Sequence, residues 1–178
     1  MSNKLDPSQR RPEGAPLAKL IDAATILIVR RDMKKPSVLM GHRSAAHKFM
    51  PNTFVFPGGR LDPDDHTPPT AGDLAKATMH RLMRKRRASK RKARALALAA
   101  IRETFEETGL IVGRKHGGAI DPASVAPDWQ DFFAAGYAPA VDALDYIYRA
   151  VTPPNNFRRF DARFFFADAE HAFGEIGG

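Results

Sequence analysis

The most informative stretch of this sequence runs from Arg102 to Leu110 and reads Arg-Glu-Thr-Phe-Glu-Glu-Thr-Gly-Leu. Residues three and four positions apart lie on the same face of a helix, so Glu103 would share a face with both Glu106 and Glu107. Carboxylates at this spacing repel one another, and a divalent cation such as Mg²⁺, which prefers oxygen ligands, relieves that repulsion. The alternative interpretation is a solvated acidic helix end that binds nothing.

This stretch closes a long helical region. From about residue 73 to 108 the sequence contains strong helix formers and neither proline nor glycine. Gly109 is well placed to cap the C-terminus of the helix. A straight helix of this length is unusual in a small domain, so we predict a break near Ala88 and Ser89. Arg102 lies four residues before Glu106 and is expected to hold its carboxylate in place.

Apolar runs on both sides of the helix predict β-strands. The predicted strands cover residues 25–31, 37–42, 53–56, 110–112, 145–151 and 163–167, with a loop over 152–161. The first two form a hairpin, and a short helix over 128–135 places Trp129, Phe132 and Phe133 in the core. Strands and helices mixed in this order predict an α/β sandwich around a mixed sheet.

The composition limits the class of protein. A chain of 178 residues fits one domain, and the absence of cysteine excludes disulfides, thiolate nucleophiles and cysteine metal sites. No apolar run approaches the roughly 20 residues of a membrane span. Residues 1–20 are polar, lack the apolar core of a signal peptide and are expected to form a disordered tail before a domain over 21–178. We therefore expect a cytoplasmic protein without membrane contact.

The positive charge is concentrated in one segment. The net charge is +8, and nine basic residues fall between Arg81 and Arg94, so the rest of the chain sums to −1. We interpret the segment as a solvated helix within an insertion at about 66–94. The alternatives are contact with nucleic acid and attraction of a polyanionic substrate. No aromatic residues interleave the charges, which argues against stacking on bases.

The helical stretch, together with Phe56-Pro57-Gly58-Gly59 before it, resembles the Nudix box, G-x5-E-x7-R-E-U-x-E-E-x-G-U, where U is a bulky aliphatic residue. The matching residues are Gly59, Arg102, Glu103, Glu106, Glu107, Gly109 and Leu110. Two departures stand out: Thr104 occupies a U position, and Arg102 follows Gly59 by 43 positions instead of 14, so 29 additional residues interrupt the box. Asp65 is the candidate for the first glutamate of the pattern.

The resemblance implies an α/β/α sandwich and a Mg²⁺-dependent hydrolase, with Mn²⁺ as an alternative ion. Only eleven residues follow Ala167, so the last strand and helix of such a fold are expected to be lacking. Glu106 and Glu107 would bind the metal together with the backbone of Gly59. Glu103 would be either a third ligand or the base that orients water, and Arg102 would orient the carboxylates. These four side chains are the candidate catalytic residues.

A second resemblance concerns the substrate. Residues 39–45, Leu-Met-Gly-His-Arg-Ser-Ala, resemble the motif upstream of the box in coenzyme A diphosphatases, and residues 152–165 are similar to the branch typified by the animal peroxisomal enzyme. This implies hydrolysis of coenzyme A or its acyl esters, with Arg43, Ser44, Gly58 and Gly59 binding the substrate. Arg43 would contact either the diphosphate or the 3′-phosphate.

Several alternatives stay open at this stage. The substrate could be another small-molecule diphosphate, such as ADP-ribose or a damaged nucleotide. A non-catalytic module that binds nucleic acid through Arg81 to Arg94 is the alternative outside the enzymes. Arg158, Arg159 and Arg163 are candidates for phosphate contacts, but their spacing also suits a purely structural role. The sequence makes no prediction about oligomeric state.

Overall fold

The computed structural model describes residues 10–43, 52–84 and 88–174. Strand β1 (Leu20–Arg30) is the centre of a five-stranded sheet with the order β2-β1-β9-β8, in which β5 also pairs with β1. Strand β9 (Arg159–Asp168) runs parallel to β1. Strands β2 (Ser37–Val38), β5 (Gly58–Arg60) and β8 (Asp145–Val151) pair antiparallel with their neighbours. The predicted mixed sheet and the hairpin of the first two strands are therefore confirmed.

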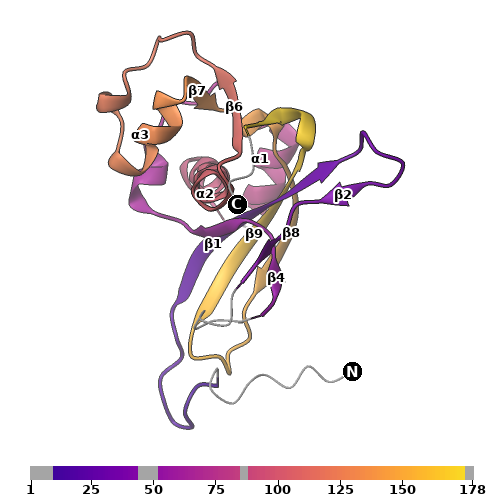
Figure 1. Ribbon diagram of the computed structural model, residues 1–178. Helices are drawn as coiled ribbons and strands as arrows, with labels where there is room; N and C mark the ends of the chain where they lie inside the picture. Colours follow the sequence, from indigo (N-terminus) through magenta and orange to yellow (C-terminus); the bar gives the residue numbers. More distant parts are fainter. Residues whose placement is uncertain (1–9, 44–51, 85–87, 175–178) are drawn as a thin grey trace.

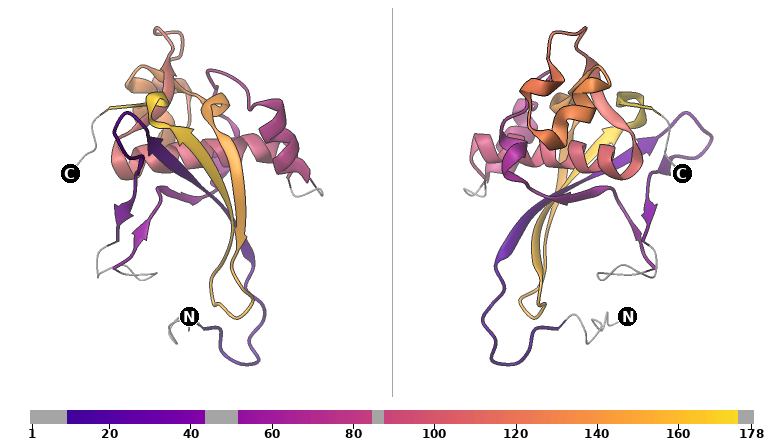
Figure 2. Two further views of the ribbon diagram at one scale, coloured as in Figure 1. Left: turned by 90° about the vertical axis from the view of Figure 1, so that its right-hand side faces the viewer. Right: turned by 60° about the vertical axis from the view of Figure 1, so that its left-hand side comes forward.

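The two faces of this sheet differ in burial. Successive side chains of a strand point to opposite faces, and burial along β9 alternates accordingly. One face of β9 is buried and carries Arg159, Asp161, Arg163, Phe165 and Ala167. The other is only half-buried and carries Phe160, Ala162, Phe164 and Phe166. The left view of Figure 2 shows the sheet in front of the helix that covers its buried face.

That helix is α2 (Lys90–Thr108), the centre of the molecule. The Ser89 side chain accepts a hydrogen bond from the Lys92 backbone at its start, and Gly109 caps its end in the left-handed conformation at φ 75°. Residues 95–101 are buried on every side, because α2 lies between the large sheet and a second layer (Figure 1). The second layer comprises β6 (Ile111–Lys115), β7 (Tyr137–Pro139), β10 (Ala172–Phe173) and α3 (Pro127–Ala134).

The predicted break in the long helical region is confirmed. Helix α1 (Lys76–Met83) ends before residues 85–87, which lie outside the described ranges, and α2 begins after the Ser89 cap. The Thr78 hydroxyl lies 3.3 Å from Asp145 Oδ1, which places α1 against β8 on the same face of the sheet as α2. In the described part of the chain no helix covers the opposite face, where an α/β/α sandwich has its second helical layer.

Several predicted boundaries were wrong. The strand expected over 37–42 is split, because β2 pairs with β1 whereas β3 (Gly41–His42) pairs with β4 (Phe54–Val55). The turn expected at Gly58 and Gly59 continues as β5. Strand β9 starts inside the predicted loop over 152–161, and β10 pairs with β6 after the last predicted strand. These differences share one cause, since backbone pairing with distant strands leaves little trace in local composition.

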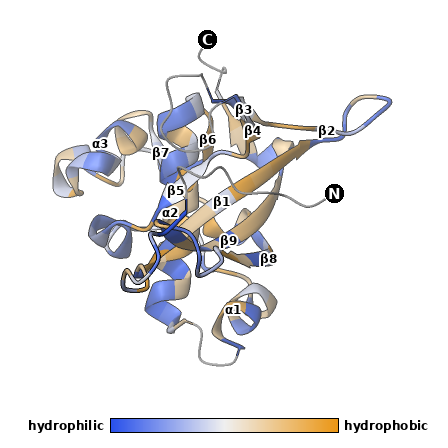
Figure 3. Cartoon of the chain, turned by 90° about the horizontal axis from the view of Figure 1, so that it is seen from below, coloured by the Kyte–Doolittle hydropathy of each residue, from blue (hydrophilic) through white to orange (hydrophobic). Residues whose placement is uncertain are grey.

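The core prediction for the short helix is confirmed. Trp129, Phe132 and Phe133 of α3 are fully buried, and Phe132 meets Phe105 of α2 edge-on with ring centroids 5.3 Å apart. Apolar residues also run along β1, as the hydropathy colouring in Figure 3 shows. Of the predicted N-terminal tail, residues 1–9 lie outside the described part, whereas the Arg11 backbone donates to the Asn155 carbonyl at 2.8 Å. None of the described helices has the length and apolar character needed to cross a membrane.

Candidate active site

The two glycines of β5 bring the backbone unusually close to α2. Gly59 pairs with Ala24 of β1, and a Cβ atom at Gly59 would overlap the carboxylate of Glu103. Gly58 has φ 150°, and a Cβ atom there would overlap the Ala24 carbonyl. Only glycine tolerates both constraints. The Gly-Gly pair is therefore the feature that lets a strand edge pack directly on the carboxylate-bearing turn of the helix.

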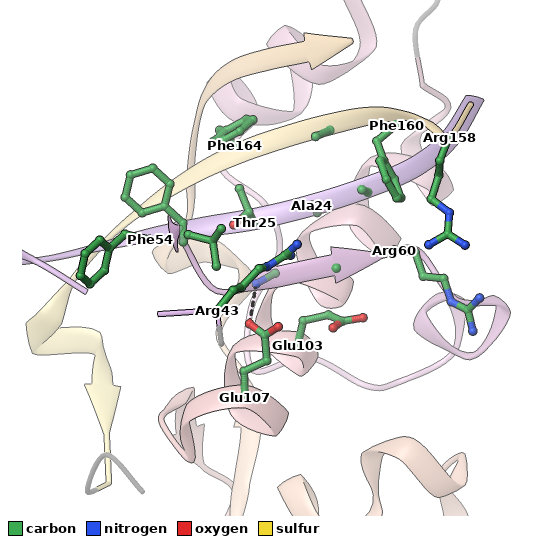
Figure 4. A pocket seen from close by; sticks show the side chains of 16 residues that line it. Ala24, Thr25, Arg43, Phe54, Arg60, Glu103, Glu107, Arg158, Phe160 and Phe164 are labelled. Atoms are coloured by element: carbon green, nitrogen blue, oxygen red, sulfur yellow. Dashed lines mark hydrogen bonds between the residues drawn. The ribbon is translucent and has the colours of Figure 1, made fainter. Parts of the chain in front are cut away.

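The side chains of Glu103 and Glu107 face β5. The Gly58 backbone donates a hydrogen bond to Glu107 Oε2 at 3.1 Å, drawn as the dashed line in Figure 4. The Glu103 carboxylate lies against Gly59 and is half-buried. Both side chains line the same pocket. The predicted common face of these two glutamates is thus present and points at the end of β5.

The third glutamate of the cluster is turned toward Arg102. The guanidinium Nη1 of Arg102 lies 3.1 Å from Glu106 Oε2 and 3.1 Å from Glu103 Oε1. The predicted contact between Arg102 and Glu106 is therefore present. Glu106 does not line the pocket, although it shares the helix turn with the two glutamates that do.

Asp65 completes the surroundings of Arg102. Arg102 Nε donates to Asp65 Oδ1 at 2.9 Å and Nη2 donates to Asp65 Oδ2 at 3.1 Å, which is a bidentate pair. Asp65 is fully buried, and it also accepts a hydrogen bond from the Asp62 backbone at 2.8 Å. The residue that the resemblance offered for the first box glutamate thus binds the box arginine, from a short 3₁₀ helix (Pro63–His66).

Burial and neighbouring charges together shift the pKa values of this cluster. Burial disfavours the guanidinium charge of Arg102, but the hydrogen bond and charge of Asp65, with the charges of Glu103 and Glu106, raise the pKa of Arg102 above its ordinary value. Burial also raises the pKa of the Glu103 carboxyl, against the lowering effect of Arg102. Three carboxylates, those of Asp65, Glu103 and Glu106, thus share the guanidinium of Arg102, and Glu107 adds a fourth negative charge on the same helix turn.

The donor set fits a divalent metal. Glu103, Glu106 and Glu107 offer carboxylate oxygens from one helix turn, and the backbone of Gly59 lies directly against the Glu103 carboxylate. Within the described residues, one group has three carboxylates whose oxygens all lie within 4.8 Å, and it comprises Asp62, Asp64 and Asp128. That group lies outside the pocket. The three box glutamates do not form such a group within the described residues, and Glu103 and Glu106 are both paired with Arg102.

The pocket in front of the glutamates has a volume of about 660 Å³ and opens on the half-buried face of the large sheet. Figure 4 shows its organisation. Phe54 and Phe164 lie at one end, Arg43 and the two glutamates lie in the middle, and Phe160 lies with Arg60 and Arg158 at the other end. The floor is formed by small residues of β1 and β9, including Ala23, Thr25 and Ala162.

The structure brings together most of the predicted site. Arg43, Gly58, Gly59, Glu103 and Glu107 all line the pocket. Ser44, which the sequence analysis assigned to substrate binding, lies outside the described residues.

The three arginines near the C-terminal strand divide by position. Arg163 is buried, with Nη1 at 2.5 Å from Asp161 Oδ1, and Arg159 is buried and donates to the carbonyls of Thr152 and Ala18. Both are structural. Arg158 is exposed and lines the pocket. The alternation of a strand explains the division, because Arg159, Asp161 and Arg163 share the buried face.

Sequence reasoning missed Arg60, Phe160 and Phe164 as pocket residues. The signal for the two phenylalanines was available, since they stand at alternating positions with Ala162 in a strand whose other face is buried. Arg60 could not be found in the same way, because β5 was interpreted as a turn.

Comparison with known proteins gives two informative similarities. The chain is 30% identical over 152 residues to "Putative nudix hydrolase 7" of Caenorhabditis elegans, which covers 80% of this chain and 42% of that protein. The chain therefore spans less than half the length of this curated relative. The crystal structure of a NUDIX hydrolase from Alicyclobacillus acidocaldarius superposes with a TM-score of 0.61 at 29% identity, covering 92% of this chain and 76% of that one. No family model matches the chain. The two similarities nevertheless agree with each other and with the geometry around Gly59 and Arg102, and they support membership of this chain in the Nudix hydrolase superfamily.

Proposed function

We propose that this chain is a Mg²⁺-dependent diphosphatase that cleaves a nucleoside diphosphate linked to a second group, with coenzyme A or an acyl-coenzyme A as its substrate. The observation that carries the proposal is the shared pocket of Glu103, Glu107, Gly59 and Arg43. Carboxylates that can hold a cation and an arginine that can hold a phosphate are the two requirements of diphosphate hydrolysis. The coenzyme A part rests on the resemblance of residues 39–45 to the upstream motif.

The side chains have distinct roles in this proposal. Glu103, Glu106 and Glu107 would hold the ion, with Gly59 contributing its backbone. When bound, Mg²⁺ neutralises charge on the diphosphate and lowers the pKa of a bound water. Arg102 fixes the glutamates from below through its ion pairs, and Arg43 binds a phosphate oxygen from the pocket side. Glu103 is either a third ligand or the group that accepts the proton of the attacking water.

The pocket suits a substrate with unlike ends. Phe54 and Phe164 present apolar surface at one end, which suits an alkyl or acyl group. Coenzyme A has its pantetheine arm on one side of the diphosphate and its nucleotide on the other. Cleavage would yield phosphopantetheine and adenosine 3′,5′-bisphosphate. ADP-ribose, which lacks an apolar arm, would leave the phenylalanine end without a partner.

The first experiment is a substrate panel with Mg²⁺, read by the products formed from coenzyme A, acetyl-coenzyme A, ADP-ribose and a dinucleoside polyphosphate. We expect the two coenzyme A compounds to have the highest kcat/KM. Preference for ADP-ribose would overturn the substrate assignment and leave the hydrolase proposal standing. Hydrolysis of none of these compounds would count against both.

The second experiment tests the metal site. Replacing Glu107 with glutamine removes a ligand charge from an exposed position of α2, so kcat should fall by about 100-fold or more while the melting temperature changes little. Glu13→Gln, an exposed glutamate far from α2 in sequence, is the matched control. Activity of Glu107→Gln within a few-fold of the unmodified chain would contradict the assignment.

A further inference from the structure

Two arginines at one end of the pocket have no role in the proposed hydrolysis. Arg60 and Arg158 line the pocket beside Phe160, and both are exposed (Figure 4). Within residues 10–43, 52–84 and 88–174, neither arginine pairs with a carboxylate. Arginines that project into a pocket without a carboxylate partner remain available to bind an anionic ligand.

The sheet itself aims both arginines at this end. Arg60 of β5 pairs with Ala23 of β1, which in turn pairs with Ala162 of β9. Directly paired residues project from the same face of a sheet, so Arg60 stands in one row with two alanines. Arg158 precedes β9 and has the same alternation as Phe160 and Ala162. The small alanines leave the space between the arginines and the glutamates open.

The character of the lining changes along the pocket. Its lining includes two carboxylates, Glu103 and Glu107, and both lie in the middle. Arg60 directly follows Gly59, and consecutive Cα atoms are about 3.8 Å apart, so the cationic end begins immediately beside the glutamates. The opposite end is formed by Phe54 and Phe164. An extended ligand would therefore meet an apolar end, a metal-binding middle and a cationic end in that order.

We propose that Arg60 and Arg158 form a second anion site, which binds a phosphomonoester that the substrate carries in addition to its diphosphate. The guanidinium fork suits the oxygens of a phosphate, and the aromatic ring of Phe160 lies beside both arginines at this end of the pocket. The substrate is thereby oriented, with its phosphorylated nucleoside at Arg60 and Arg158 and its other group at Phe54 and Phe164. This inference rests on the proposed function, since it assigns the ends of the same substrate, and it leaves Arg43 to the diphosphate.

The test compares coenzyme A with 3′-dephospho-coenzyme A, which differ by one phosphomonoester. Hydrogen bonds to charged groups are worth about 1.5–3 kcal/mol, and each 1.36 kcal/mol is tenfold in rate. Arg60→Gln and Arg158→Gln should each lower kcat/KM for coenzyme A by about tenfold or more, and by less than about threefold for the dephospho compound. Arg30→Gln removes the same charge from the far end of β1 and should change neither value. Equal losses on both substrates, or no loss, would overturn the second anion site.

A binding measurement separates this inference from the proposed hydrolysis. Without metal, calorimetry should show adenosine 3′,5′-bisphosphate binding about tenfold more tightly than adenosine 5′-monophosphate, with the difference lost in Arg60→Gln and Arg158→Gln. If the chain hydrolyses neither coenzyme A compound but shows this binding difference, the hydrolysis proposal fails and the anion site stands. Equal affinity for the two nucleotides would overturn the anion site whatever the hydrolysis result.

Discussion

Arg102 is buried beneath the carboxylates that it organises, and its partners come from two segments that the interruption of the box separates. Glu103 and Glu106 are its neighbours on α2, whereas Asp65 reaches it from the 3₁₀ helix that follows β5. A buried guanidinium needs such partners, because an unpaired buried charge is costly. Arg102 and Asp65 are 37 residues apart in the sequence and nevertheless form a bidentate pair in the structure.

At the residue scale, Asp65→Asn should destabilise the fold by about 3 kcal/mol, because it leaves the Arg102 charge with a weaker buried partner. Unfolding by urea, followed by fluorescence of Trp129, measures the change. Asp64→Asn is the matched control, since Asp64 is the adjacent carboxylate and has no contact with Arg102. A similar small effect for both variants would show that the bidentate pair contributes little to stability.

At the scale of the elements, the residues of the basic segment between Arg81 and Arg94 have different roles. Lys92 pairs with Asp22 of β1 at 2.6 Å, and Arg94 donates to the Pro68 carbonyl and to Thr70. Burial lowers the pKa of Arg94, although the charge of Asp73 opposes this. Lys90 and Arg91 at the start of α2 are exposed. Part of the segment thus fastens α2 to the sheet and the preceding loop, and part of it carries solvent-exposed charge.

The exposed part is predicted to act only through long-range attraction. The double variant Lys90→Gln with Arg91→Gln should leave kcat unchanged and raise KM by a few-fold at low salt, with the effect vanishing as salt screens the charges. The matched control is Lys34→Gln with Lys35→Gln, which removes the same charge from the exposed β1–β2 turn. Salt-sensitive binding of RNA or DNA that the first variant loses would instead favour the nucleic-acid interpretation.

At the scale of the whole molecule, an ion network on the buried face joins three strands and the central helix. Arg149 of β8 donates to both oxygens of Asp161 of β9, at 2.6 and 2.8 Å, and Arg163 lies 2.5 Å from the same carboxylate. Arg163 also approaches Asp22 of β1, to which Lys92 of α2 is paired. The network fixes the large sheet relative to α2, and therefore the pocket relative to the glutamates.

This network makes the free energy of unfolding depend on pH. Burial raises the pKa of Asp161, but the hydrogen bonds from Arg149 and Arg163 outweigh that effect and hold it below its ordinary value. A carboxyl with a lowered pKa in the folded state contributes fully above its unfolded value, about 3.9, and loses the contribution as pH falls below it. The loss of stability in Asp161→Asn should therefore be larger at pH 7 than at pH 3. A difference that stays constant across this range would contradict the prediction, and Asp32→Asn serves as the exposed control.

The sequence by itself determined the features that depend on neighbours along the chain. The spacing of Glu103, Glu106 and Glu107 placed them on one helix turn, Ser89 and Gly109 marked the ends of α2, and apolar runs marked several of the strands. These features follow from backbone geometry over a few residues, so they can be predicted without knowledge of the fold. The resemblance to the Nudix box could be recognised for the same reason, since each part of the box is a local motif.

Only the tertiary structure decided which distant residues share the pocket. The pairing of Arg60 with Ala23, and of Ala23 with Ala162, is a matter of register between strands far apart in the sequence. Register also determines that Arg158 faces the pocket, whereas Arg159 and Arg163 lie on the buried face of the sheet. A shift of one residue in the pairing of β9 would exchange its two faces. The composition of residues 158–163, RRFDAR, therefore does not determine which arginine points toward the pocket. The physical reason is that a strand has two faces and only its partners determine which one is covered.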